Sequence, residues 1–205
     1  MISVYQVKPK FQQLLKPVLV KLHSSKITAN QITISAILLS AIIGFCFWNA
    51  DDYHILYLAL PVGLFTRMAL NALDGMMART YAQQSKLGEV LNELGDVVSD
   101  LLIYFPLLKF EPEINYLVVI FLCLTIINEF AGVLGKTLNG ERRYDGPMGK
   151  SDRAMLVGLY GLLGFFNISI NSIAQWIFAA IILLLMLSTF LRIKRALALS
   201  NKQVK

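Results

Sequence analysis

The sequence predicts an all-α integral membrane protein, a six-transmembrane-helix bundle preceded by an amphipathic interfacial helix, with both termini cytoplasmic. The first observation behind this prediction is composition: of 205 residues, 56% are hydrophobic and 16% charged, with a mean hydropathy of +0.60. Soluble domains carry about 25% charged residues. The second observation is a series of apolar runs near the roughly 20 residues that a spanning helix needs. The third is the strong bias of Lys and Arg to one side of those runs.

The apolar runs divide the chain into six expected spans. The fifth and sixth come from a single run of uncharged residues, which the turn-forming NISINS of residues 167–172 divides. The expected spans are residues 27–50, 53–73, 87–108, 114–136 and the two parts of 154–191.

The distribution of positive charge fixes the expected orientation. Of the 19 Lys and Arg residues, 17 fall in the terminal segments or in the connections after the second and fourth spans. The positive-inside rule places those segments, and so both termini, in the cytoplasm. The net charge of +6 is therefore explained by topology and requires no nucleic-acid partner.

Three regions follow from this pattern. Residues 1–26 are an N-terminal amphipathic interfacial segment, because Phe11, Leu14, Val18 and Leu22 recur at helical spacing among lysines. Residues 27–195 form the six-helix membrane domain, and residues 196–205 form a cytoplasmic tail. We expect a multi-pass protein of the bacterial inner membrane.

One stretch is unusually polar for such a chain: residues 71–100, NALDGMMARTYAQQSKLGEVLNELGDVVSD. On a helix, Asn71 and Asp74 share a face. Glu89, Asn92, Glu93, Asp96 and Asp100 follow the same three-to-four spacing and form one stripe on the third span. Two facing helices with oxygen ligands make a site for a hard divalent cation. Carboxylates at a hydrated helix end are the simpler reading, but Asp100 lies about three turns into the span, where ionisable groups are usually functional.

This stretch resembles the signature of the class I CDP-alcohol phosphotransferases, D-x-x-D-G-x-x-A-R, seven or eight residues, then G-x-x-x-D-x-x-x-D. The resemblance extends over nearly the whole chain, because the family has a six-helix core that often follows an amphipathic cytoplasmic helix. Asn71 and Asn92 replace the first and third Asp of the pattern. The positions that match it are Asp74, Gly75, Ala78, Arg79, Gly88 and Asp96.

The resemblance implies transfer of a phosphatidyl group from CDP-diacylglycerol, or a related CDP-alcohol, to an acceptor alcohol, with release of CMP. It implies Mg²⁺ or Mn²⁺ at Asn71, Asp74, Asn92 and Asp96, with Asp96 as general base. It also implies CDP binding around Asp74, Gly75, Ala78, Arg79 and Gly88, a cytoplasmic active site and a homodimer. The acceptor alcohol is left open.

The two asparagines leave three interpretations. The protein binds its metal more weakly, or binds one ion instead of two; or Glu93, Asp100 or Glu129 restores the missing charge; or the site is inactive. Asn keeps a ligating oxygen, so an active enzyme is favoured. The alternatives are a lipid- or nucleotide-binding pseudoenzyme and, less favoured, a small transporter.

Basic residues outside the signature form a second candidate group. Arg142, Arg143, Lys150 and Arg153 follow the fourth span. They either attract phosphate groups, which would favour a phosphorylated acceptor, or are ordinary positive-inside charges. Arg67 lies within the second span and is expected to turn inward, because exposing it to lipid is costly. Arg67 either supplies a charge in place of a metal or binds a substrate phosphate. Glu129, within the fourth span, is either an internal ion-pair partner or a ligand.

Overall fold

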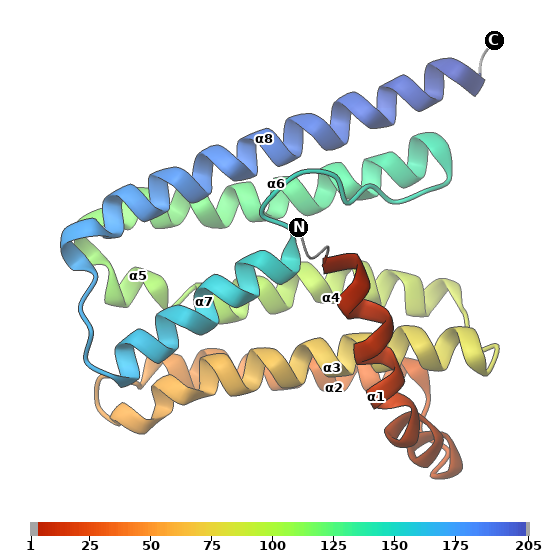
Figure 1. The fold of residues 1–205 in the computed structure, drawn as a ribbon, viewed down its shortest axis with the longest axis horizontal. Helices are drawn as coiled ribbons and strands as arrows, with labels where there is room; N and C mark the ends of the chain where they lie inside the picture. The colour runs from red at the N-terminus through yellow and green to blue at the C-terminus, as the bar shows by residue number, and fades with distance from the viewer. Residues whose placement is uncertain (1–3, 204–205) are drawn as a thin grey trace.

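A computed structural model shows that the described part of the chain consists of helices joined by turns and loops (Figure 1). The structure describes the backbone of residues 4–203, and side chains within residues 9–138 and 140–198. Its elements are α1 (Val4–Ser24), α2 (Ala29–Trp48), η1 (His54–Leu58), α3 (Ala59–Thr80), α4 (Lys86–Tyr104), α5 (Leu107–Phe110), η2 (Pro112–Ile114), α6 (Asn115–Asn139), α7 (Lys150–Phe165) and α8 (Asn171–Gln203).

The long helices pack in two groups that α4 and α7 join. α2 packs against α3 and α4, α6 packs along α8, and α7 packs against α3. The approach of α2 to α4 is close enough that a Cβ at Gly44 would lie 2.1 Å from the carbonyl oxygen of Leu102. A side chain of any size at residue 44 would therefore separate the two helices.

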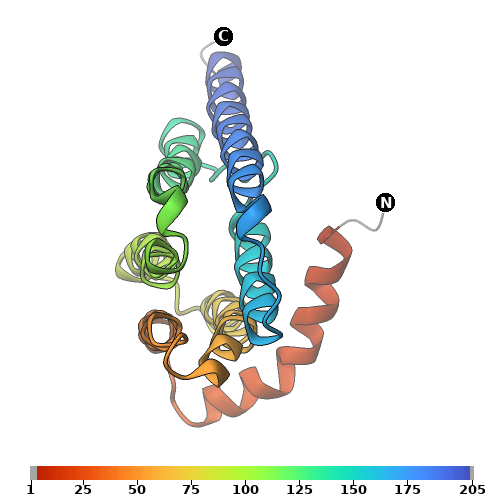
Figure 2. The same ribbon diagram turned by 90° about the vertical axis from the view of Figure 1, so that its left-hand side faces the viewer.

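The N-terminal helix lies across the bundle instead of along it (Figure 2). Leu19 of α1 is buried with Ala29 and Ile32 of α2 and Met77 of α3 in a small apolar cluster. Leu14 points away from this cluster and is 76% exposed. The helix predicted for residues 1–26 is therefore present from residue 4 to residue 24; its place on the cytoplasmic leaflet remains a prediction.

The helix ends near the signature are held by local hydrogen bonds. Thr28 begins α2 with a capping box, because its side chain accepts from Gln31 N while Gln31 accepts from Thr28 N. Ser85 begins α4, and its hydroxyl accepts from Gly88 N at 3.0 Å. These caps fix the first turns of two helices that border the candidate site.

Four helical segments are long and apolar enough to cross a membrane among the residues described. They are Ala29–Trp48, His54–Thr80, Pro112–Leu138 and Asn171–Ala198. α4 carries several ionisable side chains and α7 has only 16 residues, so a total of six spans remains a prediction. The expected turn at residues 167–172 is present, since α7 ends at Phe165 and α8 begins at Asn171. α8 continues to Gln203, so the segment expected to form the cytoplasmic tail is helical as far as residue 203; its place in the cytoplasm remains a prediction.

The segment between α6 and α7 returns into the bundle before α7 begins (Figure 1). The backbone N–H of Arg143 donates to the carbonyl of Gly132 on α6 at 3.1 Å. A Cβ at Gly146 would lie 2.6 Å from the Cα of Ser188 on α8. The basic segment that follows the fourth expected span is therefore packed between α6 and α8, and α7 starts with its first residues already inside the bundle.

Candidate active site

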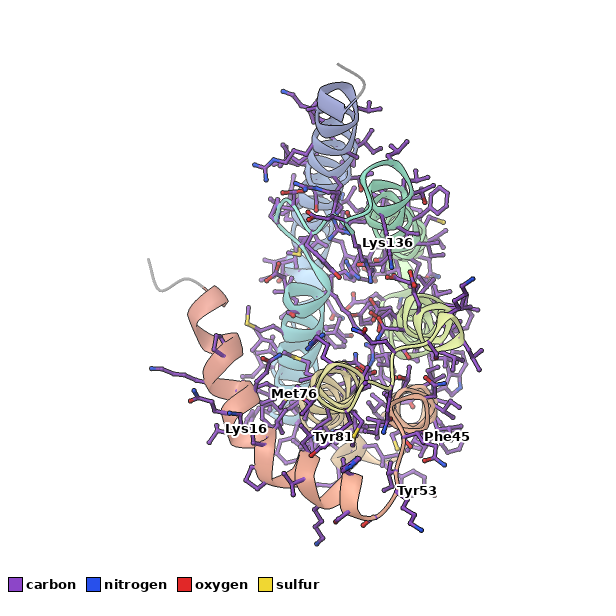
Figure 3. All side chains as sticks on the ribbon, turned by 90° about the vertical axis from the view of Figure 1, so that its right-hand side faces the viewer. Lys16, Phe45, Tyr53, Met76, Tyr81 and Lys136 are labelled. Atoms are coloured by element: carbon purple, nitrogen blue, oxygen red, sulfur yellow. The ribbon has the colours of Figure 1, made fainter. Side chains whose placement is uncertain are left out.

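The signature residues come from α3 and α4, and five of them line one cavity of about 580 Å³: Asp74, Gly75, Ala78, Gly88 and Asn92. Asn71, Arg79 and Asp96 are not among its lining residues. Figure 3 views the end of the molecule where the α3–α4 turn and the C-terminal end of α6 lie, with Tyr81 and Lys136 labelled. The first turns of α2 complete the lining. The cavity is lined by Ala29, Asn30, Thr33, Asp74, Gly75, Ala78, Gln83, Gln84, Ser85, Lys86, Gly88, Glu89, Asn92, Glu93 and Lys136. Seven residues that the sequence analysis singles out, from Asp74 to Glu93, therefore share this cavity.

Asp74 is the most enclosed of the signature carboxylates, with 4% of its surface exposed. Its Oδ2 accepts a hydrogen bond of 2.9 Å from the hydroxyl of Thr33 on α2. Its Oδ1 is buried without a hydrogen-bond partner. A buried carboxylate oxygen without a donor is costly unless something binds it, so Asp74 is prepared for a positively charged ligand.

The two signature glycines are explained by close approaches on the cavity wall. A Cβ at Gly88 would lie 2.6 Å from Oδ1 of Asn30. At Gly75 it would lie 3.2 Å from Nη1 of Arg79, whose guanidinium therefore covers this glycine. Small residues at these positions keep open the space between α2, α3 and α4.

Asp96 lies one turn beyond Asn92 on α4 and forms an ion pair with Lys150, the first residue of α7. The amino group of Lys150 contacts Oδ1 of Asp96. The returning segment between α6 and α7 thus delivers a positive charge to the proposed base. This contact joins residues 54 positions apart, and sequence spacing gave no sign of it.

Asp100 is fully enclosed and is bound by two arginines. Nη1 of Arg67 donates to its Oδ1 and Nη2 of Arg153 donates to its Oδ2, both at 2.8 Å. Side-chain exposure is 2% for Arg67, 1% for Asp100 and 0% for Arg153. The inward orientation predicted for Arg67 is confirmed.

Glu129 on α6 is a second carboxylate at the centre of this ionic cluster. It accepts from Arg142 at 2.6 Å and from Arg153 at 2.8 Å, and Nη1 of Arg192 lies 3.9 Å away. Arg142 also lies 2.6 Å from Oε2 of Glu93. Glu129 is thus an internal ion-pair partner, one of the two roles expected for it.

Arg143 points elsewhere. It pairs with Asp145 at 2.7 Å, and Asp145 also pairs with Arg195. Burial acts to raise the pKa of Asp145, but the hydrogen bonds from Arg195 and Arg143 outweigh it and hold that pKa below its usual value. This pair fastens the returning segment to α8 and lies outside the cavity.

Several residues of the site were missed by the sequence analysis. Thr33 holds Asp74, Lys136 pairs with Glu89 at the cavity, and Arg192 is 2% exposed inside the bundle. Arg192 and Lys136 were counted only as topology-setting charges. A lone Thr on an apolar helix gives no signal in the sequence; its place opposite Asp74 depends on how α2 packs against α3.

A divalent metal such as Mg²⁺ or Mn²⁺ needs several oxygen ligands close together. Within the described residues, no group of three or more His, Cys, Asp or Glu side chains is placed to hold an ion. The signature offers two carboxylates, Asp74 and Asp96, and two amide oxygens, Asn71 and Asn92. Oxygen ligands of this kind suit Mg²⁺ and Mn²⁺, and the unpartnered Oδ1 of Asp74 fits such an ion.

Together, the fold and site define a helical, multi-pass membrane protein with an oxygen-rich cavity between α2, α3 and α4. The chain belongs to the CDP-alcohol phosphatidyltransferase family, whose model matches residues 26–199. Membership identifies it as an enzyme of phospholipid biosynthesis.

Two relatives in sequence agree with this family. The inner membrane protein YnbA of Escherichia coli (strain K12) is 52% identical over 161 residues, which are 78% of this chain and 79% of YnbA. The archaetidylinositol phosphate synthase of Pyrococcus horikoshii is 34% identical over 100 residues, 49% of this chain and 50% of that relative. The match to YnbA, together with four apolar helices, supports a multi-pass protein of a bacterial inner membrane.

Solved structures share the fold. The phosphatidylinositol phosphate synthase PgsA1 of Mycobacterium tuberculosis, with CDP-DAG bound, has a TM-score of 0.73 at 16% identity, covering 90% of this chain and 94% of that one. A second structure of that enzyme, in complex with manganese and citrate, has a TM-score of 0.70 at 17% identity, covering 86% and 87%.

Proposed function

We propose that the protein transfers a phosphatidyl group from CDP-diacylglycerol, or a related CDP-lipid, to an acceptor alcohol and releases CMP. The observation that carries this proposal is the cavity itself. Five signature residues of α3 and α4 line it, and one of them, Asp74, has a buried carboxylate oxygen without a hydrogen-bond partner in the protein. The presence of CDP-DAG in the structure of a protein with the same fold supports the choice of donor.

The nucleotide end of the donor is assigned to the cavity wall formed by the last turns of α3 and the first turns of α4. Gly75, Ala78 and Gly88 leave space there for the nucleotide. The guanidinium of Arg79, which lies against Gly75, can donate two parallel hydrogen bonds to a phosphate. The lipid chains of the donor would stay in the bilayer beside the apolar outer faces of the helices.

Asn71, Asp74, Asn92 and Asp96 would hold Mg²⁺ or Mn²⁺, which supplies positive charge to neutralise the pyrophosphate. We assign one ion to this site instead of two. Only two of the four ligand positions carry a charge, and Glu93 and Glu129, which could have compensated, face Arg142. Asp100, the third candidate, is bound by Arg67 and Arg153.

Asp96 is assigned as general base. It would accept the proton of the acceptor hydroxyl as that oxygen bonds to the phosphorus that carries the diacylglycerol. The bond between this phosphorus and the bridging oxygen breaks, and CMP leaves with the electron pair. Lys150, whose amino group contacts Oδ1 of Asp96, would orient this carboxylate before the acceptor binds.

The orientation and assembly are part of the same proposal. The active site faces the cytoplasm, because the α3–α4 connection and the start of the returning segment lie on the Lys- and Arg-rich side. A homodimer would use the outer face of α4, opposite its carboxylates. Leu87, Val90 and Leu94 on that face are each at least 58% exposed in the single chain.

The proposal is tested by CMP release from CDP-diacylglycerol in detergent, across a panel of alcohols, with Mg²⁺, Mn²⁺ or a chelator. Metal-dependent release that is lost in Asp96→Asn establishes the enzyme; loss of a general base typically costs about 10²- to 10⁴-fold in rate. A folded protein that binds the CDP-lipid but releases no CMP with any alcohol would instead establish the pseudoenzyme.

A further inference from the structure

This inference rests on the proposed function and concerns the acceptor. The sequence left the acceptor open: the four basic residues after the fourth expected span either attract phosphate groups, which would favour a phosphorylated acceptor, or are ordinary positive-inside charges. The acceptor hydroxyl must reach Asp96, so the charges around Asp96 decide which acceptors fit. Lys150 pairs with the carboxylate of Asp96, and Arg67 lies 3.4 Å from its backbone carbonyl. Arg142 and Arg153 bind the carboxylates about one turn to either side of Asp96, Glu93 and Asp100.

Each of these four bases already has a carboxylate partner. Lys150 pairs with Asp96 itself, and Arg67 pairs with Asp100. Arg153 lies between Asp100 and Glu129 with 2.8 Å contacts to both, and its side chain is fully buried.

Arg142 has two carboxylate neighbours, although its Nε and Oε2 of Glu93 have no hydrogen-bond partner. Its two terminal nitrogens lie 2.6 Å from Glu93 and 2.6 Å from Glu129. A phosphate that took this guanidinium would have to displace Glu93 or Glu129, and Glu129, 4% exposed, would lose one of its two close arginine contacts and keep only that with Arg153. Breaking a buried ion pair in this way is strongly unfavourable.

The cavity beside this cluster is not basic either. Its charged lining consists of three carboxylates and two amines, and one of the amines, Lys136, is paired with Glu89. The lining does include the amide of Asn92 and the carboxylate of Glu93, groups that can form hydrogen bonds with the hydroxyl groups of an acceptor.

We infer that the acceptor is a hydroxyl-bearing alcohol without a phosphate group. Glu129, with Glu93, sets this preference by holding the guanidinium groups that would otherwise bind a phosphate monoester. Glu129 is thus a specificity-determining residue that acts through Arg142 and Arg153.

The test compares matched acceptors on the purified full chain: glycerol with glycerol 3-phosphate, and inositol with inositol 1-phosphate, each with CDP-diacylglycerol and CMP release as the readout. We expect kcat/KM for the unphosphorylated member of one pair to exceed that of its phosphate ester by about tenfold or more. Equal or faster release with the phosphate ester overturns the inference while leaving the proposed function standing. Absence of CMP with every acceptor overturns both.

Variants locate the cause of the preference. Glu129→Gln removes one carboxylate partner from each of Arg142 and Arg153, which keep Glu93 and Asp100 respectively. It should shift the ratio of kcat/KM by about tenfold or more toward the phosphate ester. Glu111→Gln is the matched control: Glu111 is also a buried carboxylate, 5% exposed, but it binds the hydroxyl of Tyr160 at 3.0 Å and no arginine. Its ratio should not change.

Glu93→Gln provides a second route, because Glu93 is less buried and its removal frees one side of Arg142. It should shift the ratio in the same direction even if Glu129→Gln does not fold. A folded Glu129 or Glu93 variant with the wild-type ratio overturns the role assigned to these carboxylates.

Discussion

Arg153 and Glu129 lie 2.8 Å apart in the centre of the bundle, with side chains 0% and 5% exposed. The contact joins α7 to α6, and the second contact of Arg153, to Asp100, continues the connection to α4. One guanidinium therefore links three helices that come from distant parts of the sequence. In a bundle of apolar helices, the buried ion pairs of Arg153 with Asp100 and Glu129 fix how α4, α6 and α7 are aligned with one another.

Replacing Arg153 by Ala should lower the free energy of unfolding by about 3–5 kcal/mol, because two buried carboxylates lose a partner. Denaturant unfolding in detergent measures this loss. Arg195→Ala is the control: Arg195 also pairs with a carboxylate, Asp145, but is 58% exposed, and exposed pairs contribute at most about 1 kcal/mol. Equal effects of the two changes would contradict the assigned role of burial.

Thr33→Val should weaken metal binding by about 10- to 100-fold, as is typical when a residue that orients a ligand is lost. The change keeps the shape of the side chain but removes the hydroxyl that donates to Asp74. Mn²⁺ titration followed by electron paramagnetic resonance measures the affinity without substrate. Thr33→Ser should retain it, and so should Ser40→Ala, since Ser40 donates to the carbonyl of Ala36 on its own helix. An unchanged affinity in Thr33→Val would remove Thr33 from the site.

Asn71→Asp and Asn92→Asp should each tighten Mn²⁺ binding, because ligand charge is a main determinant of affinity for hard cations. Calorimetry on the protein alone should show a dissociation constant at least about tenfold lower, with a second ion bound in the double variant. Asn115→Asp, at an exposed position on α6, controls for added charge. If the two single variants and the double variant bind Mn²⁺ no more tightly than the Asn115→Asp control, residues 71 and 92 are not ligands.

Gly44→Ala should destabilise the protein by about 1–3 kcal/mol, the usual cost of overpacking. The added Cβ would meet the backbone carbonyl of Leu102 at 2.1 Å, and backbone cannot rotate away as a side chain can. At Gly158 the nearest atom would lie 3.6 Å away. Gly158→Ala should therefore be neutral or slightly stabilising, because Ala favours helix over Gly by about 1 kcal/mol. Thermal unfolding of both variants distinguishes these outcomes.

The sequence by itself determined the helical class, the positions of the long apolar helices, the turn at residues 167–172 and the family signature. These features are local. A helix follows from a run of some 20 apolar residues, and the signature follows from the spacing of Asp74, Gly75, Ala78, Arg79, Gly88 and Asp96 along two helices.

Only the tertiary structure decided which charges meet. Lys150 reaches Asp96, and Arg142 reaches Glu129, because the segment after α6 returns between α6 and α8. In the sequence these bases could not be distinguished from ordinary positive-inside charges, because the sequence does not show toward which residue a side chain points. Burial then turns the contacts into strong constraints, because a charge removed from water must find a partner within the protein. That pairing, which no spacing rule reveals, is the basis of the inferred preference for an acceptor without a phosphate group.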